Sequence, residues 1–218
     1  MFAYLNKDLK TVRRFEDRLQ KFVADEDIHL NANSRRVGQV YAYLTNFNRS
    51  FLEVDVPAMN DLGEEIISAH ARGDFRPNSH RWGLFLYICA AARFLAEADD
   101  KALDQLNDII NMRGGILRED LLITARLLHA LCNFELGNYS LVDYHLTGLA
   151  RVLRRRREAA GVHHLAVSGL RRLLKTPVAE HGQVYEKLRD ELIAVKDQPF
   201  EQKALSYLNL GWWLSNKK

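Results

Sequence analysis

The 218-residue chain is poor in the residues that bridge or break structure, with 2 cysteines, 4 prolines and 12 glycines. Cys89 and Cys132 lie forty-three residues apart in apolar stretches, which excludes a disulfide framework and predicts buried, reduced thiols. The longest apolar run, Trp82 to Ala92, is about half as long as a membrane-spanning helix requires. The polar stretch Asn6 to Asp8 interrupts the apolar core that an export signal would need. These absences predict a cytoplasmic protein without a transmembrane segment.

Strand-forming residues are also scarce. Val, Ile and Thr together occupy 27 positions, against 55 for Leu and Ala. This composition favours helices over strands. The hydrophobic share of 47% and the charged share of 27% are typical of a globular chain and exclude a disordered tail or a fibre. An all-α fold is therefore expected.

Apolar residues recur at three- and four-residue steps along most of the chain, as they do on the buried face of a helix. The periodicity predicts an N-terminal helix within residues 1–30, helical hairpins over residues 34–195 and a C-terminal capping helix over residues 199–215, all in one domain. Short joints with Gly, Pro or Asn separate the helices and make neighbours antiparallel. The helices predicted between the two ends are Ser34 to Phe51, Ala58 to Arg72, Ser79 to Glu97, Asp100 to Met112, Glu119 to Leu136, Ser140 to Ala159, Val162 to Leu174 and Glu180 to Val195.

Alternate helices share a register of 42 residues. Four rows of mostly apolar or small residues occupy positions i, i+3, i+4 and i+8, the spacing of a buried helical stripe. The rows are Leu44, Leu86, Leu128 and Leu170; Phe47, Cys89, Leu131 and Leu173; Asn48, Ala90, Cys132 and Leu174; and Leu52, Phe94, Leu136 and Val178. The period predicts a helical hairpin of about 42 residues that is stacked three or four times.

The turn Glu135 to Tyr139, with its Gly-Asn-Tyr sequence, resembles the turn between the helices of tetratricopeptide (TPR) repeats. The stretches Phe134 to Leu153 and Pro199 to Leu214 are also similar to the C-terminal part of bacterial helical-repeat proteins of TPR type. The period differs from the family's ~34 residues, and Asn133 stands where an aromatic residue is usual. The resemblance implies a right-handed α-solenoid that binds proteins. HEAT-like repeats, which have a similar period, are the alternative.

A basic segment covers residues 151–175 and carries a net charge of +7, which leaves −4 for the rest of the chain. Its cations are Arg151, Arg154, Arg155, Arg156, Arg157, Arg171, Arg172 and Lys175. Such a segment can bind an acidic protein, a nucleic acid or an anionic membrane surface. The structural alternative is a solvated face, because consecutive arginines point around a helix and cannot all meet one ligand.

One step around each helix from the apolar rows lies a second, more polar set of residues. In a TPR-like solenoid this set would line the concave groove, whereas on a convex face it would meet only solvent. The candidates for partner binding are Arg49, Tyr87, Arg126, His129, Asn133, Arg171 and Lys175. A groove of this chemistry suits an acidic peptide. The expected function is therefore a non-catalytic scaffold that binds a protein or acidic peptide, with nucleic-acid association as the alternative.

No spacing in the chain indicates a catalytic, metal or cofactor site. His163 and His164 are adjacent, so they diverge by about 100 degrees on a helix and do not form the clamp that a metal prefers. His129 could share a helix face with Cys132, but the apolar register places that cysteine in the core. We therefore expect no enzyme activity, no metal and no cofactor.

The two ends of the chain carry separate expectations. The amphipathic pattern begins almost at Met1 with no polar cap, which predicts a homodimer through the N-terminal helix or a chain that is the C-terminal part of a longer repeat protein. At the other end, Leu205, Leu208 and Trp212 form one stripe, so Trp212 is expected to dock on the last hairpin.

Overall fold

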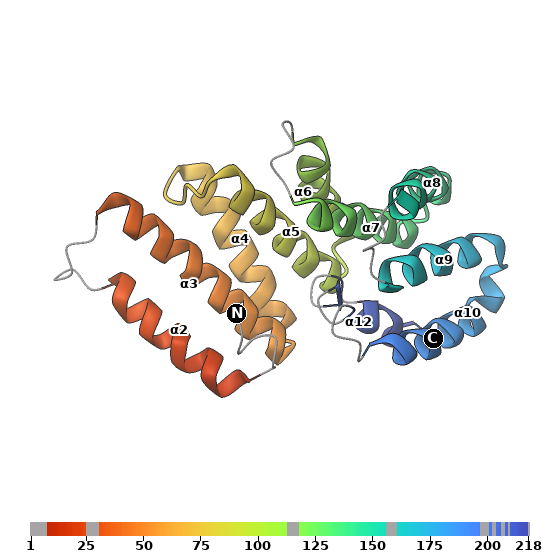
Figure 1. Cartoon of the computed structure of the whole chain (residues 1–218), viewed down its shortest axis with the longest axis horizontal. Coiled ribbons are helices and arrows are strands. Elements are labelled where there is room, and N and C mark those ends of the chain that lie inside the picture. The colour runs from red at the N-terminus through yellow and green to blue at the C-terminus, as the bar shows by residue number, and fades with distance from the viewer. Residues whose placement is uncertain are drawn as a thin grey trace. The chain divides into compact units, whose positions relative to one another are not determined.

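The computed structural model describes residues 8–24, 31–112, 118–155, 161–196, 201, 204–205, 208 and 210–217. Within these ranges the regular structure is helical and no strand occurs, which confirms the all-α class (Figure 1). Residue contacts divide the chain into two compact units, Met1–Ala92 (unit 1) and Arg93–Lys218 (unit 2).

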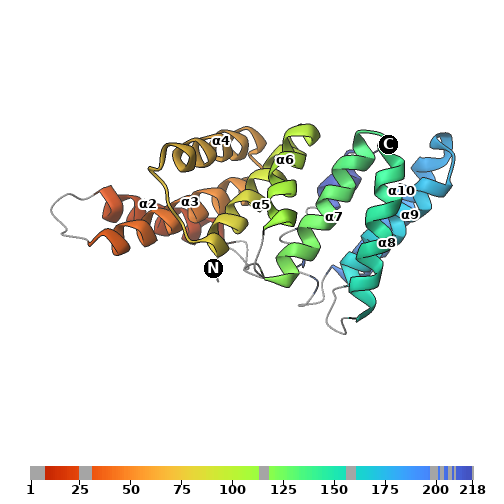
Figure 2. The same cartoon turned by 90° about the horizontal axis from the view of Figure 1, so that it is seen from above.

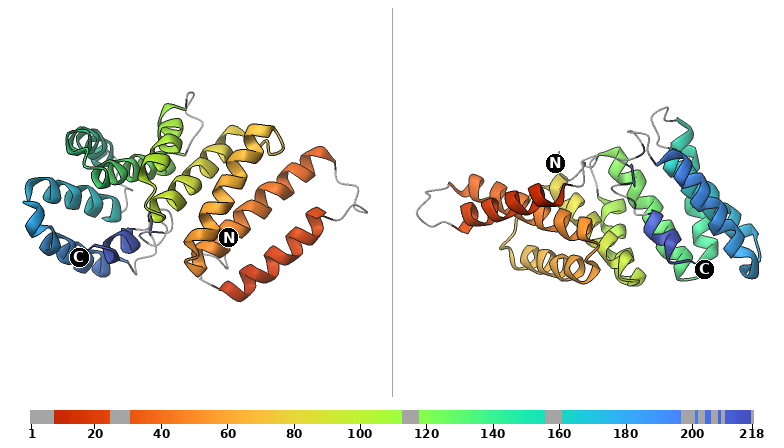
Figure 3. Two further views of the ribbon diagram at one scale, coloured as in Figure 1. Left: turned by 180° about the vertical axis from the view of Figure 1, so that it is seen from behind. Right: turned by 90° about the horizontal axis from the view of Figure 1, so that it is seen from below.

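Unit 1 contains three helices, α2 (Leu9–Ala24), α3 (Ala32–Glu53) and α4 (Val56–Arg72), and most of a fourth, α5 (Ser79–Leu95). Helix α3 lies between α2 and α4, as the red and orange ribbons of Figure 3 show. Helix α2 leaves two large side chains exposed, Phe15 and Phe22.

The starts of these helices follow from local capping. Asn31 accepts a hydrogen bond from the Ser34 amide at 2.8 Å, so α3 begins at Ala32, two residues before the predicted Ser34. Asp55 caps α4 in the same way through the amide of Ala58. Gly73, at φ +82°, ends α4 in the left-handed conformation that favours glycine.

The core of unit 1 is apolar and partly aromatic. Met59 and Ile66 of α4 are fully buried, and Phe75 and Phe85 meet edge to face with their ring centroids 5.0 Å apart. Cys89 packs on Gly63, where an added Cβ would lie 3.6 Å from the cysteine sulfur. Neither Cys89 nor Cys132 forms a disulfide and both are buried, as the apolar context predicts.

Unit 2 contains α6 (Asp99–Asn111), α7 (Glu119–Glu135), α8 (Tyr139–Arg155), α9 (Gly161–Lys175), the 3-10 turn η1 (Val178–Glu180), α10 (His181–Val195) and α12 (Leu210–Ser215). Sequence neighbours pack against one another as hairpins: α6 with α7, α7 with α8, α8 with α9 and α9 with α10 (Figure 2). Helix α7 also contacts α9, and nearly all of its residues from Leu121 to Phe134 are buried. Helix α7 is therefore the central helix of unit 2.

The C-terminal helix α12 docks through Trp213, the neighbour of the predicted Trp212. Trp213 is buried, whereas Trp212 is half-buried. The indole of Trp213 donates to Glu135 Oε1 at 2.6 Å, and its ring meets Tyr185 edge to face. Arg189 donates to the carbonyl of Leu214 at 2.8 Å. Leu208 of the predicted stripe is buried as well, but it precedes α12, which begins at Leu210.

Two of the four rows of the 42-residue register differ in burial. The row from Phe47 to Leu173 is buried at all four positions. The row that ends with Leu136 and Val178 is not, since these two side chains are 45% and 71% exposed. Helix α7 ends at Glu135 and α9 ends at Lys175, so both residues lie beyond the helical stripe that was expected to bury them.

Candidate functional site

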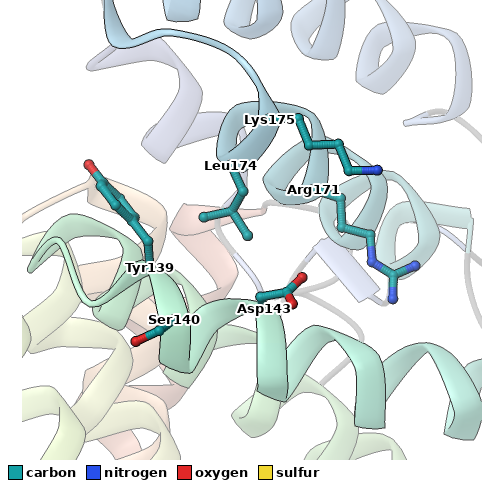
Figure 4. A pocket seen from close by; sticks show the side chains of 6 residues that line it. All are labelled: Tyr139, Ser140, Asp143, Arg171, Leu174 and Lys175. Atoms are coloured by element: carbon teal, nitrogen blue, oxygen red, sulfur yellow. The ribbon is translucent and has the colours of Figure 1, made fainter.

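A hollow of about 560 Å³ lies between α8 and α9 in unit 2. Two predicted binding residues, Arg171 and Lys175, line it from α9. The other lining residues are Tyr139, Ser140, Asp143 and Leu174. Figure 4 shows Leu174, Arg171 and Asp143 pointing into the gap between the helices, with Tyr139 at one end. The side chains of this hollow carry two positive charges and one negative charge.

Local structure places these side chains. Leu170 and Leu173 are buried and anchor α9, which leaves Arg171 half-buried and Lys175 exposed near its C-terminal end. The Arg171 guanidinium donates to the carbonyl of Leu146 at a long 3.4 Å. Neither cation forms an ion pair with a described carboxylate, so both charges remain available to a ligand.

Arg151, Arg154 and Arg155 of the predicted basic segment are exposed on α8. None of the three pairs with a carboxylate in the described part of the chain, and Arg154 donates only to the Ala150 carbonyl. They lie in the last turns of α8, whereas the hollow is lined by residues near the start of that helix. Arg156 and Arg157 lie outside the described residues.

Arg172 does not belong to this free basic surface. Its guanidinium forms a bidentate ion pair with Glu191, with Nη1 2.9 Å from Oε1 and Nη2 2.6 Å from Oε2. This pairing lowers the pKa of Glu191. The predicted patch therefore loses Arg172 to an intramolecular contact between α9 and α10. Charge counts along the sequence do not reveal such a partner, because Glu191 is nineteen residues away.

His129 and Asn133 belong to a buried polar network instead of an open groove. Asn133 is 2% exposed and donates to the carbonyl of His129 at 2.9 Å and to its Nδ1 at 3.2 Å. The Nε2 of His129 lies 3.2 Å from Asn107 Oδ1 on α6. Asn138, in the turn before α8, donates to Asn133 Oδ1 at 3.1 Å. The network ties α6, α7 and the turn together, and it leaves neither residue accessible to a partner.

Burial also fixes the protonation state of this network. Burial, reinforced by His145, lowers the pKa of His129 to about 4. The Asn133 amide donates to Nδ1 of His129, and Oδ1 of Asn107 faces its Nε2. These partners match a neutral imidazole with its proton on Nε2. Arg126 is half-buried nearby and, after burial, is the second cause of the lowered pKa of His145.

Two predicted partner-binding residues, Tyr87 and Arg49, belong to unit 1, and neither is available to a partner. Tyr87 is 1% exposed, which contradicts its placement in a groove. Arg49 lies between Glu16, at 2.8 Å, and Glu53, at 2.6 Å. Burial raises the pKa of Glu16, and Arg49 opposes that rise. The Arg49 guanidinium is therefore a structural counter-ion that joins α2 to α3.

Acid and thiol groups meet at one further place, between α6 and α7. Cys132 is fully buried and interacts with Asp99, and burial and this carboxylate raise the pKa of the thiol. Burial raises the pKa of Asp99 to about 6. A thiol that resists ionisation is a poor nucleophile. Among the described residues, no group of three His, Cys, Asp or Glu side chains could hold a metal ion.

Sequence reasoning missed four of the six residues that line the hollow. Leu174 was assigned to a buried row, and Tyr139, Ser140 and Asp143 were not considered as ligands. The relevant signal is that α8 begins directly after the tight turn at Gly137, so its first turn lies opposite the end of α9. This juxtaposition depends on how the hairpins pack.

Comparison of the chain with protein-family models, with curated proteins and with solved structures finds no match. Within the described ranges, no helix is long and apolar enough to span a bilayer.

Proposed function

We propose that this protein is a non-catalytic, cytoplasmic scaffold of TPR-like helical hairpins that binds an acidic segment of a partner protein. The hollow between α8 and α9 is the binding site. The observation that carries the proposal is the convergence on one concave surface of Arg171 and Lys175, two cations that pair with no described carboxylate. The hairpin pairs of unit 2 support a repeat architecture, in which the 42-residue register would define the repeat.

The chemistry of the hollow favours a short peptide over a small metabolite. It is open, and its lining surface is more apolar than polar, with Leu174 and the ring of Tyr139 beside the charged groups of the other side chains. A ligand would gain charge pairing from Arg171 and Lys175 and contact area from the two apolar side chains. Asp143 would select against a uniformly acidic ligand near the first turn of α8, so acidic residues spaced by an apolar one fit best.

The test measures the binding of a fluorescent peptide with alternating glutamate and leucine to the full chain. The double variant Arg171→Glu/Lys175→Glu should weaken binding by at least about tenfold, since each reversal replaces an attraction by a repulsion. The matched control is Lys101→Glu/Lys187→Glu, which makes the same charge change at two exposed lysines of α6 and α10. Equal loss in both double variants would show that only net charge matters and would contradict the proposed site.

The alternative is a nucleic-acid-associated protein that uses the exposed arginines of α8. Arg151, Arg154 and Arg155 favour it because they lie within two turns and pair with no described carboxylate. This function predicts an affinity that falls steeply with salt concentration. Absence of binding to a mixed-sequence duplex at about 50 mM salt would remove it.

Association through the N-terminal helix is a separate proposal. Phe15 and Phe22 on α2 are 50% and 43% exposed and lie seven residues apart on the helix. A second copy of the chain could bury them. Analytical ultracentrifugation of the parent and of Phe15→Ser/Phe22→Ser would test the homodimer, which should dissociate in the double variant.

A further inference from the structure

The outer face of α8 carries a straight row of side chains that no part of the described chain covers. Leu141, Tyr144, Gly148, Arg151 and Arg155 follow one another at steps of three and four residues, so they align along one side of the helix over about 21 Å. Leu141 is 49% exposed and Tyr144 is 74% exposed. The opposite side of α8 contains the buried residues that pack on the neighbouring helices, Val142, Leu146, Leu149 and Leu153. We call the exposed row the α8 seam.

Gly148, in the middle of the seam, has no explanation within the fold. A Cβ built on it would meet nothing within 4 Å, so packing does not require a glycine there. Glycine in a helix interior is less favourable than alanine, because it loses more backbone freedom on folding. What glycine does provide is a place where a second backbone can approach closely.

The two halves of the α8 seam differ in charge. Leu141 and Tyr144 make the N-terminal half apolar, and Arg151 and Arg155 make the C-terminal half cationic. A matching partner has apolar side chains opposite the first half, a small residue opposite Gly148 and carboxylates opposite the arginines. Spacing at three and four residues is the spacing by which helices pack along one another.

We propose that the α8 seam binds an amphipathic helix of a partner protein, with apolar residues at one end of its contact stripe and Asp or Glu at the other. This surface goes beyond the hollow, since Arg171 and Lys175 take no part in it. A second copy of α8 is a poor occupant, because a parallel pair would place arginines against arginines and an antiparallel pair would bury Arg151 and Arg155 against Leu141 and Tyr144. A nucleic acid would use the arginines and stack on Tyr144, but it would gain nothing from Leu141 or from the lack of a side chain at Gly148.

The test uses two alanine-based helical peptides of about 20 residues. Each carries two leucines, one alanine and two glutamates at the spacing of the seam, and one peptide has this order reversed because the seam fixes no chain direction. A third peptide has lysines in place of the glutamates. We expect one glutamate peptide to bind the full chain with a Kd in the micromolar range and the lysine peptide not to bind.

Three variants of the full chain locate the contact. Gly148→Gln adds bulk without charge and should weaken binding by at least about tenfold, while its thermal midpoint should not fall, because glutamine is the better helix former. Tyr144→Ala should weaken binding to a similar degree. Arg171→Glu/Lys175→Glu should leave it within about twofold. Since that double variant should weaken binding of the extended acidic peptide by at least about tenfold, the two surfaces can fail independently.

Several results would overturn the proposal. They are no saturable binding of either glutamate peptide at about 1 mM, equal binding of the glutamate and lysine peptides, and undiminished binding to Gly148→Gln. A duplex that binds the parent and Gly148→Gln equally well, while the peptides do not bind, would assign the seam to nucleic acid.

Discussion

Arg49 in unit 1 and Lys175 in unit 2 lie three periods apart in the predicted 42-residue register, yet their surroundings are opposite. Arg49 is held by Glu16 and Glu53, whereas Lys175 borders the hollow and is exposed. Tyr87 and Arg171, two periods apart, form a second such pair, since Tyr87 is buried and Arg171 is half-buried. Position in the register therefore does not decide whether a side chain can meet a partner. The neighbouring helix decides it: Glu16 of α2 pairs with Arg49 in unit 1, whereas no described carboxylate pairs with Arg171 or Lys175 in unit 2.

The largest expected difference is in the free energy of unfolding, between the alanine variants of Tyr87 and Arg171. Tyr87→Ala removes a fully buried aromatic ring and should lower the free energy of unfolding by about 3–5 kcal/mol. Arg171→Ala removes one long hydrogen bond at a half-buried site and should change it by less than about 0.5 kcal/mol. Chemical denaturation of the parent and both variants measures the two values. Similar losses would mean that Arg171 has a structural role and would weaken its assignment to a binding site.

The second comparison sets Arg49 against Lys175. Arg49→Ala leaves the buried Glu16 without its counter-ion and should reduce stability by about 2–4 kcal/mol. Lys175→Ala should have an effect within about 0.5 kcal/mol. Because the pKa of Glu16 is already raised by burial, its ionised form disfavours folding, and acid should relieve this. The loss in Arg49→Ala should therefore be smaller at pH 4 than at pH 7, and an equal loss at both would contradict the counter-ion role.

A third comparison sets the buried His129 of unit 2 against the half-buried His70 of unit 1. His129→Leu leaves Asn107 and Asn133 without their ring partner and should cost about 1–3 kcal/mol at pH 7. The folded pKa of His129, about 4, lies below the ordinary value of 6.5, so its stabilisation is complete above pH 6.5 and is lost as the pH falls towards 4. The difference between parent and variant should shrink over that range.

His70 of unit 1 provides the reference for His129. It stacks on Trp82 with ring centroids 3.6 Å apart, and burial, followed by Arg76, lowers its pKa. Proton NMR of the imidazole rings should show His70 titrating below 6.5 but at a higher pH than His129. The reverse order would show that the network around His129 is more open than the structure indicates.

The smallest expected change in stability comes from replacing two helical glycines by alanine. Gly148→Ala in unit 2 should stabilise the protein by about 0.5–1 kcal/mol, since the added methyl meets nothing and alanine is the better helix former. Gly38→Ala in unit 1 places its Cβ 2.9 Å from a methyl of Val23 on α2, so the same gain is offset by crowding. Thermal unfolding of both variants should show a rise for Gly148→Ala and a smaller rise or a fall for Gly38→Ala.

The helical class and most helix positions could be predicted because they depend on local rules. Apolar spacing, capping residues such as Asn31 and Asp55, and the glycine at the end of α4 act within a few residues. The row of Phe47, Cys89, Leu131 and Leu173 was likewise predicted as core, and the structure buries all four. Stacking of the hairpins with a 42-residue repeat stays a prediction.

The candidate site was predicted less well, for a reason visible in particular residues. Arg171 and Lys175, predicted as groove residues, line the hollow from α9. The Arg172 beside them pairs with Glu191 of α10, and Asn133 and His129 turn inward to their own network. Each outcome depends on a group that is distant in the sequence or on another helix. Local spacing can place a side chain on a helix face but cannot say what lies opposite that face.

By itself, the sequence determined that this chain folds into helices, where most of them begin and end, and that positive charge gathers in residues 151–175. The tertiary structure decided which of those charges are free. Helix propensity and capping are interactions within a few residues, so they can be read along the chain. Burial and ion pairing bring together groups from different helices, as Arg49 with Glu16 and Arg172 with Glu191 show, and only packing fixes their distances.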